Sequence, residues 1–145
     1  MTKWRIVLDT NILVAASRSR NGASFALLQR LRAGQFTALA SVPLMLEYEA
    51  VLMRPEQRAA SGRSAAMTNA FLDALSLFTE PVHLHYLWRP QLRDPADEMV
   101  LETALNGRAG MLVTLNTADF GPAGQFKLPV MSPGAFLRQL TLENP

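Results

Sequence analysis

The sequence predicts an α/β protein with three layers, α/β/α, in which helices cover both faces of a central parallel sheet of four to five strands. Two observations predict this class: short apolar or β-branched segments alternate with segments of helical periodicity, and 49% of the 145 residues are hydrophobic. Strands separated by helices pair in parallel through right-handed crossovers, which buries both faces of the sheet. The length is typical of one domain, so residues 1–145 are expected to form a single domain.

The first half of the chain alternates between the two patterns. Residues 4–8 (WRIVL) predict a strand that ends at Asp9, because they form a short run rich in apolar and β-branched side chains. Residues 23–32 carry Phe25, Leu27, Leu28 and Leu31 at helical spacing, and Gly34 ends that helix. The other elements expected here are a helix start over residues 11–18, a strand over residues 36–40, and a helix that Ser41 and Pro43 begin and that runs through Leu52.

The second half continues the alternation after one polar stretch. Residues 54–64 (RPEQRAASGRS) predict a loop, because they are polar and small and lack an apolar period. Residues 82–87 predict a third strand, on which His83 and His85 would face the same side. The remaining expected elements are helices over residues 65–78, 94–107 and 133–140, a strand over residues 111–115, and a short strand within residues 128–131.

Composition excludes several classes of chemistry. The chain has no cysteine, which rules out disulfides, a thiolate nucleophile and cysteine-ligated metal sites. Two histidines, His83 and His85, make a Ser-His-Asp hydrolase or a three-histidine zinc site a poor hypothesis. Any chemistry must therefore come from carboxylates, hydroxyls, amides and arginines.

Charge and hydropathy indicate the expected setting. The formal net charge is +2, and 12 of the 14 basic residues are arginine, which suits phosphate partners but also arises from genome composition alone. The amino-terminal MTKWRIVLDTN reaches a charge too early for a signal peptide. No apolar run approaches the ~20 residues that span a bilayer. We therefore expect a cytoplasmic protein that has no membrane partner.

Acidic side chains follow the expected strands. The carboxyl ends of parallel strands meet at one edge of a sheet, where ligands bind. The side chains expected near this edge are Asp9 after the first strand, Glu47 and Glu49 after the second, Asp94, Asp97 and Glu98 after the third, and Asp119 after the fourth. Asp9 closes an apolar strand, and a desolvated carboxylate there requires a cation or hydrogen-bond donors.

Structural roles also account for several of these residues. Asp94 precedes Pro95 and suits a helix N-cap, and Asp97 lies in the first turn, where a carboxylate favours the helix dipole. Glu47 and Glu49 both fit a solvated helix face, and Asp119 fits an ordinary turn. Several carboxylates that converge on one edge would repel one another unless a cation lies between them. Mg²⁺, or Mn²⁺ in its place, is the hard cation that suits such ligands, and the chemistry it favours is phosphodiester hydrolysis by activated water.

Four segments, in order, resemble the acidic blocks of PIN-domain ribonucleases. They are IVLDTNILVAA, SVPLMLEYEAVLMRP, RDPADEMVLETAL and MLVTLNTADF, and the likeness extends from about residue 5 to Leu137. Within this family the chain most resembles the bacterial PIN proteins that act as toxins of toxin–antitoxin pairs, relatives of the VapC toxins. The resemblance implies a three-layer PIN fold, Mg²⁺ or Mn²⁺ in an acidic pocket, and endonucleolytic cleavage of single-stranded RNA.

The resemblance also implies roles for individual residues. Asp9 matches the first acid and a direct metal ligand, Glu47 matches the helix acid, and Asp97 matches the acid of the third block, with Asp94 as an accessory ligand. In the fourth block the chain has Asn116 where many PIN domains have aspartate, and we expect Asp119 to supply the missing charge. The catalytic set expected is thus Asp9, Glu47, Asp97, Asn116 and Asp119, and the metal set is Asp9, Asp94, Asp97 and Asp119.

Substrate contacts are expected from hydroxyl, amide and guanidinium groups near these acids. Thr10 and Asn11 follow Asp9 directly, and they either orient the scissile phosphate or make local hydrogen bonds at the helix start. Thr114 precedes Asn116, and Arg18 and Arg20 follow the first helix at the expected entrance for RNA.

The expected partners are RNA, a cognate antitoxin that covers the acidic groove, and a second copy of the chain in a homodimer, as the resemblance implies. Two rival hypotheses remain. One is a PIN-like module that binds RNA or protein but has lost catalytic strength, with Asn116 as the sign of the change. The other is a receiver domain or an aspartyl-phosphate phosphatase, which the absence of an acidic neighbour beside Asp9 disfavours.

Overall fold

The computed structural model describes residues 4–87 and 91–145. Within them, five parallel strands form one sheet in the order β3-β2-β1-β4-β5. The strands are β1 (Trp4–Leu8), β2 (Phe36–Ser41), β3 (Thr79–Val82), β4 (Met111–Val113) and β5 (Val130–Met131). The expected α/β class and the central parallel sheet are confirmed.

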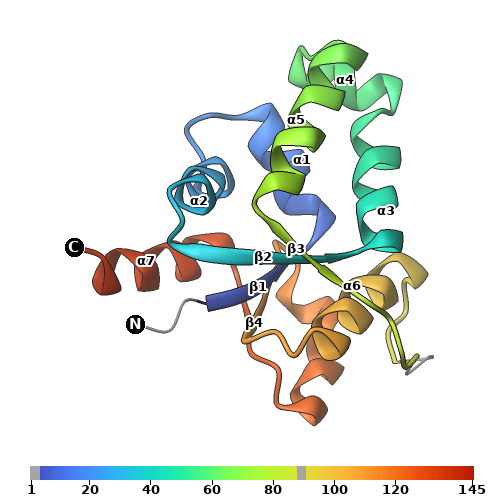
Figure 1. Cartoon of the computed structure of the whole chain (residues 1–145), viewed down its shortest axis with the longest axis vertical. Helices are drawn as coiled ribbons and strands as arrows, with labels where there is room; N and C mark the ends of the chain where they lie inside the picture. The colour runs from blue at the N-terminus through green and yellow to red at the C-terminus, as the bar shows by residue number, and fades with distance from the viewer. Residues whose placement is uncertain (1–3, 88–90) are drawn as a thin grey trace.

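Helices cover both faces of the sheet (Figure 1). On one face lie α1 (Thr10–Arg18), α2 (Ala23–Arg32), α3 (Val42–Leu52), α4 (Pro55–Ser61) and α5 (Ala65–Leu77). On the other face lie α6 (Pro95–Asn106) and a 3₁₀ segment, η1 (Thr117–Phe126). The last helix, α7 (Pro133–Glu143), packs beside α2 and places Phe136 edge-on against the rings of Trp4 and Phe36. The three-layer expectation is therefore confirmed.

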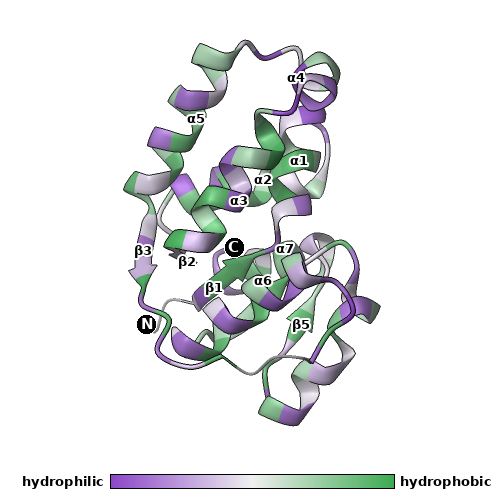
Figure 2. Cartoon of the chain, turned by 90° about the vertical axis from the view of Figure 1, so that its right-hand side faces the viewer, coloured by the Kyte–Doolittle hydropathy of each residue, from purple (hydrophilic) through white to green (hydrophobic). Residues whose placement is uncertain are grey.

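The central strands are buried on both faces. Ile6 and Val7 point to opposite faces of β1, and both are fully buried. Figure 2 shows β1 and β2 as hydrophobic, whereas α4, away from the sheet, is largely hydrophilic. Burial of neighbouring residues on both sides explains why these strands appear in the sequence as apolar runs without alternation.

Several segments differ from the sequence-based expectation; among them, β4 ends at Val113 rather than at residue 115, and η1 was not predicted. Residues 54–64 are not a loop, because α4 occupies residues 55–61 and ends at Gly62, whose φ of 72° is in the left-handed region. The helix is short and carries a buried glutamine, Gln57, in place of an apolar stripe, so hydrophobic periodicity could not reveal it.

The third strand lies earlier than expected. β3 begins at Thr79 and ends at Val82, and His83 and His85 follow it as exposed residues outside any strand. Pairing with β2, in the register Ala38 to Thr79, determines which residues join the sheet. Pro81 is compatible with this position because β3 is an edge strand, where a missing N–H donor does not interrupt the ladder.

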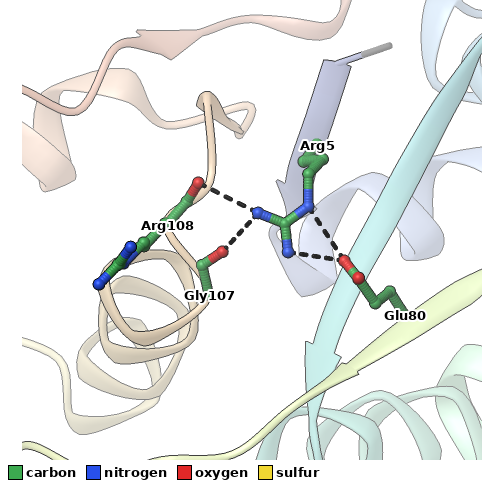
Figure 3. A network of polar contacts seen from close by, with 4 residues as sticks. All are labelled: Arg5, Glu80, Gly107 and Arg108. Atoms are coloured by element: carbon green, nitrogen blue, oxygen red, sulfur yellow. Dashed lines mark hydrogen bonds and ion pairs between the residues drawn. The ribbon is translucent and has the colours of Figure 1, made fainter. Parts of the chain in front are cut away.

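Arg5 on β1 links three elements (Figure 3). Its Nε and Nη2 atoms donate to Glu80 Oε2 on β3 at 3.1 and 2.7 Å, and its Nη1 donates to the carbonyl oxygen of Gly107 at 2.8 Å. Gly107 is the C-cap of α6, so the guanidinium group satisfies a carbonyl at the negative end of that helix. Arg5 thus holds the end of α6 against the edge of the sheet opposite the strand ends that carry the acidic side chains.

None of the helices in residues 4–87 and 91–145 has both the length and the apolar character needed to cross a membrane.

Candidate active site

Asp9 and Thr114 form the centre of the candidate site. Asp9 follows β1 and Thr114 follows β4, and these strands are neighbours in the sheet, so both residues lie at its carboxyl edge. The Thr114 hydroxyl donates to Asp9 Oδ2 at 2.7 Å, and the two side chains are buried, with exposed fractions of 0% and 6%. The backbone N–H of Asp9 donates to the Val113 carbonyl at 2.9 Å, which extends the strand pairing up to the site.

Asn11 completes a small network around this pair. Its Nδ2 donates to Thr114 Oγ1 at 3.3 Å, and its Oδ1 accepts the backbone N–H of Leu115, also at 3.3 Å. The N–H of Asn116 donates to the same Thr114 hydroxyl at 3.1 Å. The network ties the start of α1 to the turn after β4, and it orients the Thr114 hydrogen toward Asp9.

The environment of Asp9 acts on its pKa in two directions. Burial raises the pKa of Asp9, whereas the hydroxyl of Thr114 and the backbone N–H groups of Thr10 and Asn11 lower it. The charge of Asp119 raises it further. The net pKa of Asp9 lies above the ordinary value, because the effect of burial outweighs that of the hydrogen bonds.

Asp97 is affected by the charges of the other carboxylates. It lies in the first turn of α6, three residues after the N-cap Asp94, whose side chain accepts the N–H of Ala96 at 2.9 Å. Burial, followed by the charges of Asp9, Asp94, Asp119 and Glu98, raises the pKa of Asp97 to about 6. Charges at the end of β1, at the start of α6 and in η1 therefore act on the same carboxylate, although these residues are far apart in the sequence.

Glu47 is not part of this electrostatic group. It is half-buried on α3, and its charge is not among those that raise the pKa of Asp9 or Asp97. Its neighbour Tyr48 approaches the site instead: the buried phenol donates to the Leu8 carbonyl, and burial followed by the charge of Asp9 raises its pKa. The catalytic role of Glu47 stays a prediction.

The other expected residues lie at the rim or away from it. Asn116 and Asp119 are exposed at the start of η1, where the N–H of Asp119 donates to the Asn116 carbonyl at 3.0 Å. Arg18 and Arg20 are exposed at the far end of α1. Thr10 is buried directly beside Asp9. The charges of Asp9, Asp94 and Asp119 all act on Asp97, whereas the two arginines lie at the other end of α1.

Glu98 is a feature that the sequence did not single out as functional. Its Oε1 accepts the N–H groups of Gln91 and Leu92 at 2.6 and 2.7 Å, and its Oε2 is buried without a hydrogen-bond partner. The carboxylate thus holds the segment that leads into Asp94. No motif marks this role, because it depends on the path of the preceding segment around α6.

Carboxylate oxygens are the ligands that a hard divalent cation prefers. The charge of Asp119 raises the pKa of Asp9, and the charges of Asp9, Asp94 and Asp119 raise the pKa of Asp97, which a cation would reverse. In residues 4–87 and 91–145, no three His, Asp or Glu side chains are close enough as a group to hold a metal ion. Mg²⁺ typically binds through one or two carboxylates and keeps several waters, so the open arrangement is compatible with that ion.

The fold and this edge define a class of protein: a parallel α/β domain whose strand ends carry a group of mutually repelling carboxylates. The PIN domain family model matches residues 5–118, and the chain belongs to that family. The matched range includes Asp9, Glu47, Asp97 and Asn116.

A solved structure supports the fold. The chain is similar to one described as VapBC2 from Rickettsia felis bound to a DNA fragment from their promoter, with 17% sequence identity and a TM-score of 0.61. The similarity covers 88% of this chain and 98% of the other. No curated protein matches the sequence.

Proposed function

We propose that the chain is a metal-dependent endoribonuclease that hydrolyses phosphodiester bonds of single-stranded RNA. The observation that carries the proposal is the buried Asp9 at the carboxyl edge of the sheet of a PIN domain, with Asp97 exposed to the charges of Asp9, Asp94 and Asp119. Phosphodiester cleavage requires a nucleophilic water and compensation of phosphate charge. Carboxylates alone repel the phosphate, so they suit this reaction only together with a cation.

Asp9, Asp97, Asp94 and Asp119 are the residues that would hold Mg²⁺ or Mn²⁺. When bound, such an ion lowers the pKa of water and compensates negative charge on the phosphate. Asp9 is the most rigid of these groups, because Thr114 and the start of α1 restrain it. Asp97 is half-buried and has a pKa of about 6 without metal, and a bound cation would lower this pKa and favour the charged carboxylate.

The decisive experiment replaces Asp9, which is buried. Asp9→Asn keeps the shape of the side chain and the Thr114 hydrogen bond but removes the charge. We expect cleavage of single-stranded RNA in Mn²⁺ to fall by about a hundredfold or more. Asp73→Asn changes an exposed aspartate on α5 and is the matched control. The proposal fails if the wild-type chain cleaves RNA equally well in EDTA, or if both variants retain full activity.

One observation favours a second candidate, a PIN module that binds RNA or protein with little catalysis. The fourth block has the neutral Asn116, and this residue is exposed at the rim rather than held against Asp9. Asn116→Asp discriminates between the two functions. A catalytically weakened module should gain Mn²⁺ affinity and cleavage from the added charge, whereas a competent nuclease should already bind Mn²⁺ in calorimetry before the substitution.

We further propose that the protein acts in the cytoplasm as a toxin held by an antitoxin, and that it forms a homodimer. The fold likeness to a structure described as VapBC2 bound to a DNA fragment from their promoter supports this proposal. Co-expression with the product of the neighbouring reading frame tests this proposal: a stable complex that suppresses RNA cleavage would support it, and unchanged cleavage by the copurified chain would contradict it.

A further inference from the structure

A polar hollow is lined by residues of the loop that follows α1 and of the loop between α4 and α5. Both loops lie at the α4 end of the molecule (Figure 1). The hollow has a volume of about 270 Å³. Three arginines and three serines contribute to its lining: Arg18, Arg20, Arg63, Ser17, Ser19 and Ser61. We refer to this site as the arginine hollow. Gly62, which ends α4 in a left-handed conformation, directs the chain back toward it.

Two of the three guanidinium groups are held in place by neutral partners. Gln57 on α4 is 3% exposed; its Oε1 accepts from Arg18 Nε at 2.7 Å, and its Nε2 donates to Ser17 Oγ at 2.7 Å. The Arg63 guanidinium lies over the Phe71 ring, 5.1 Å from its centroid. Neither anchor carries a negative charge, so the arginines are oriented while their charges remain uncompensated.

The arginine hollow has no acidic counterpart in the described structure. The ion pair found in residues 4–87 and 91–145 joins Arg5 to Glu80, on the opposite side of the sheet, and Arg18, Arg20 and Arg63 have none. Three like charges around one cavity repel one another, and an anion in the cavity would relieve this repulsion. Guanidinium groups and serine hydroxyls are the donors that suit the oxygens of a phosphate group.

A single helix connects the arginine hollow to the acidic edge. α1 starts directly after Asp9 and ends at Arg18, so its nine residues span about 13 Å. We propose that the arginine hollow binds a backbone phosphate of the single-stranded RNA, a few nucleotides away from the bond that is cleaved. This inference rests on the proposed nuclease function, and it adds Arg63 as a binding residue and Gln57 as the residue that positions Arg18.

The test measures RNA binding without cleavage. A fluorescent single-stranded oligoribonucleotide is titrated with the full chain in EDTA at several salt concentrations. Arg63→Gln should weaken binding about threefold to tenfold at low salt, and the slope of log Kd against log salt should fall by about 0.7, as expected for one lost phosphate contact. Arg138→Gln, at an exposed arginine on α7, is the matched control and should change neither quantity.

Gln57→Glu is the second variant, because it changes almost no volume and supplies Arg18 with a carboxylate partner. It should weaken RNA binding about as much as Arg63→Gln, whereas Gln125→Glu, at an exposed glutamine, should have little effect. Thermal unfolding of each variant verifies the fold. Equal losses in Arg63→Gln and Arg138→Gln, or full RNA affinity in Gln57→Glu, would overturn the proposal.

Competitors identify the source of the anion. Millimolar inorganic phosphate that displaces RNA completely would show a site for free phosphate, and poly-glutamate that binds as tightly as RNA would show a site for an acidic protein; either result overturns the proposal. The nuclease function is judged separately. If the wild-type chain does not cleave RNA but Arg63→Gln still weakens RNA binding, the binding site is supported and the nuclease function is contradicted. If the wild-type chain cleaves RNA and Arg63→Gln binds RNA as well as the wild type, only the binding site is contradicted.

Discussion

Asp97 is half-buried among other carboxylates, and its pKa of about 6 is well above the ordinary value of 3.8. A raised pKa means that the folded chain holds this proton more tightly than the unfolded chain does. The contribution of Asp97 to the free energy of unfolding is therefore complete below about pH 3.8 and is lost as the pH rises through about 6.

This sign gives a prediction for the metal-free protein. In EDTA, the free energy of unfolding of the wild-type chain should decrease between about pH 4 and pH 7 more than that of Asp97→Asn, which has no carboxylate to ionise. Urea unfolding across this pH range measures the difference. Parallel pH profiles for the two proteins would show that the pKa of Asp97 is not raised by burial and the neighbouring carboxylates.

Thr114 carries no charge, but its hydroxyl restrains the Asp9 carboxylate and lowers its pKa. Thr114→Val keeps the shape of the side chain but removes the hydroxyl that donates to Asp9 Oδ2. Because groups behind a metal ligand tune its affinity, we expect Mn²⁺ binding to weaken about 10-fold to 100-fold in calorimetric titration. Thr117→Val, at an exposed threonine, should leave the affinity unchanged. Equal affinities for all three proteins would contradict this role.

Secondary-structure elements act in the site mainly through their ends. Asp9 follows β1 and is the N-cap of α1, Asp94 is the N-cap of α6, and Asn116 is the N-cap of η1. Asp97 lies in the first turn of α6. Acidic side chains at helix starts are favoured by the helix dipole, so the positions that build a metal site also stabilise the helices. This overlap explains why structural and functional roles could not be separated in the sequence for Asp94 and Asp97.

The segment before α6 provides a prediction at this scale. Glu98→Ala should expose the N–H groups of Gln91 and Leu92, because their carboxylate acceptor is lost, and should cost about 1–3 kcal/mol in stability. Glu98→Gln retains an acceptor oxygen and should be much closer to the wild type. Hydrogen exchange of these two amides measures the effect, and equal protection in both variants would argue against the carboxylate as the restraint.

The molecule as a whole is held together by a core that connects distant parts of the chain. Phe136 on α7 is fully buried, and its ring packs 6.0 Å from that of Trp4 and 5.4 Å from that of Phe36, between centroids. The carboxyl-terminal helix thereby covers the start of the two central strands. The strand β1 carries Asp9 at its other end, so the core and the site share this strand.

Phe136→Ala tests the contribution of this packing. Loss of the ring should lower the free energy of unfolding by about 3–5 kcal/mol, because it removes buried apolar surface and leaves a cavity. Leu142→Ala, at a leucine that is 83% exposed on the same helix, should cost little. Equilibrium urea unfolding compares the variants, and a loss below about 1 kcal/mol for Phe136→Ala would contradict the packing described.

Local signals predicted much of the fold correctly. Residues 4–8 and 23–32 match β1 and α2, and the capping residues Ser41 and Asp94 accept backbone N–H groups as expected, from Leu44 and Ala96. These features depend on neighbouring residues only, which is why the sequence reveals them. The helix α4 was missed because its stability comes from Gln57 contacts with α1 and from the turn at Gly62, not from an apolar stripe.

By itself, the sequence determined the α/β class, the starts of the capped helices and the acids that follow the strands, because periodicity, capping and burial of apolar runs are local properties. Only the tertiary structure decided that β3 ends before His83, since its bounds follow from pairing with β2. Likewise, only the fold brought Thr114 to Asp9 and oriented Arg18 and Arg63 around one cavity. Contacts between residues more than a hundred positions apart depend on the packing of whole elements, which no short segment encodes.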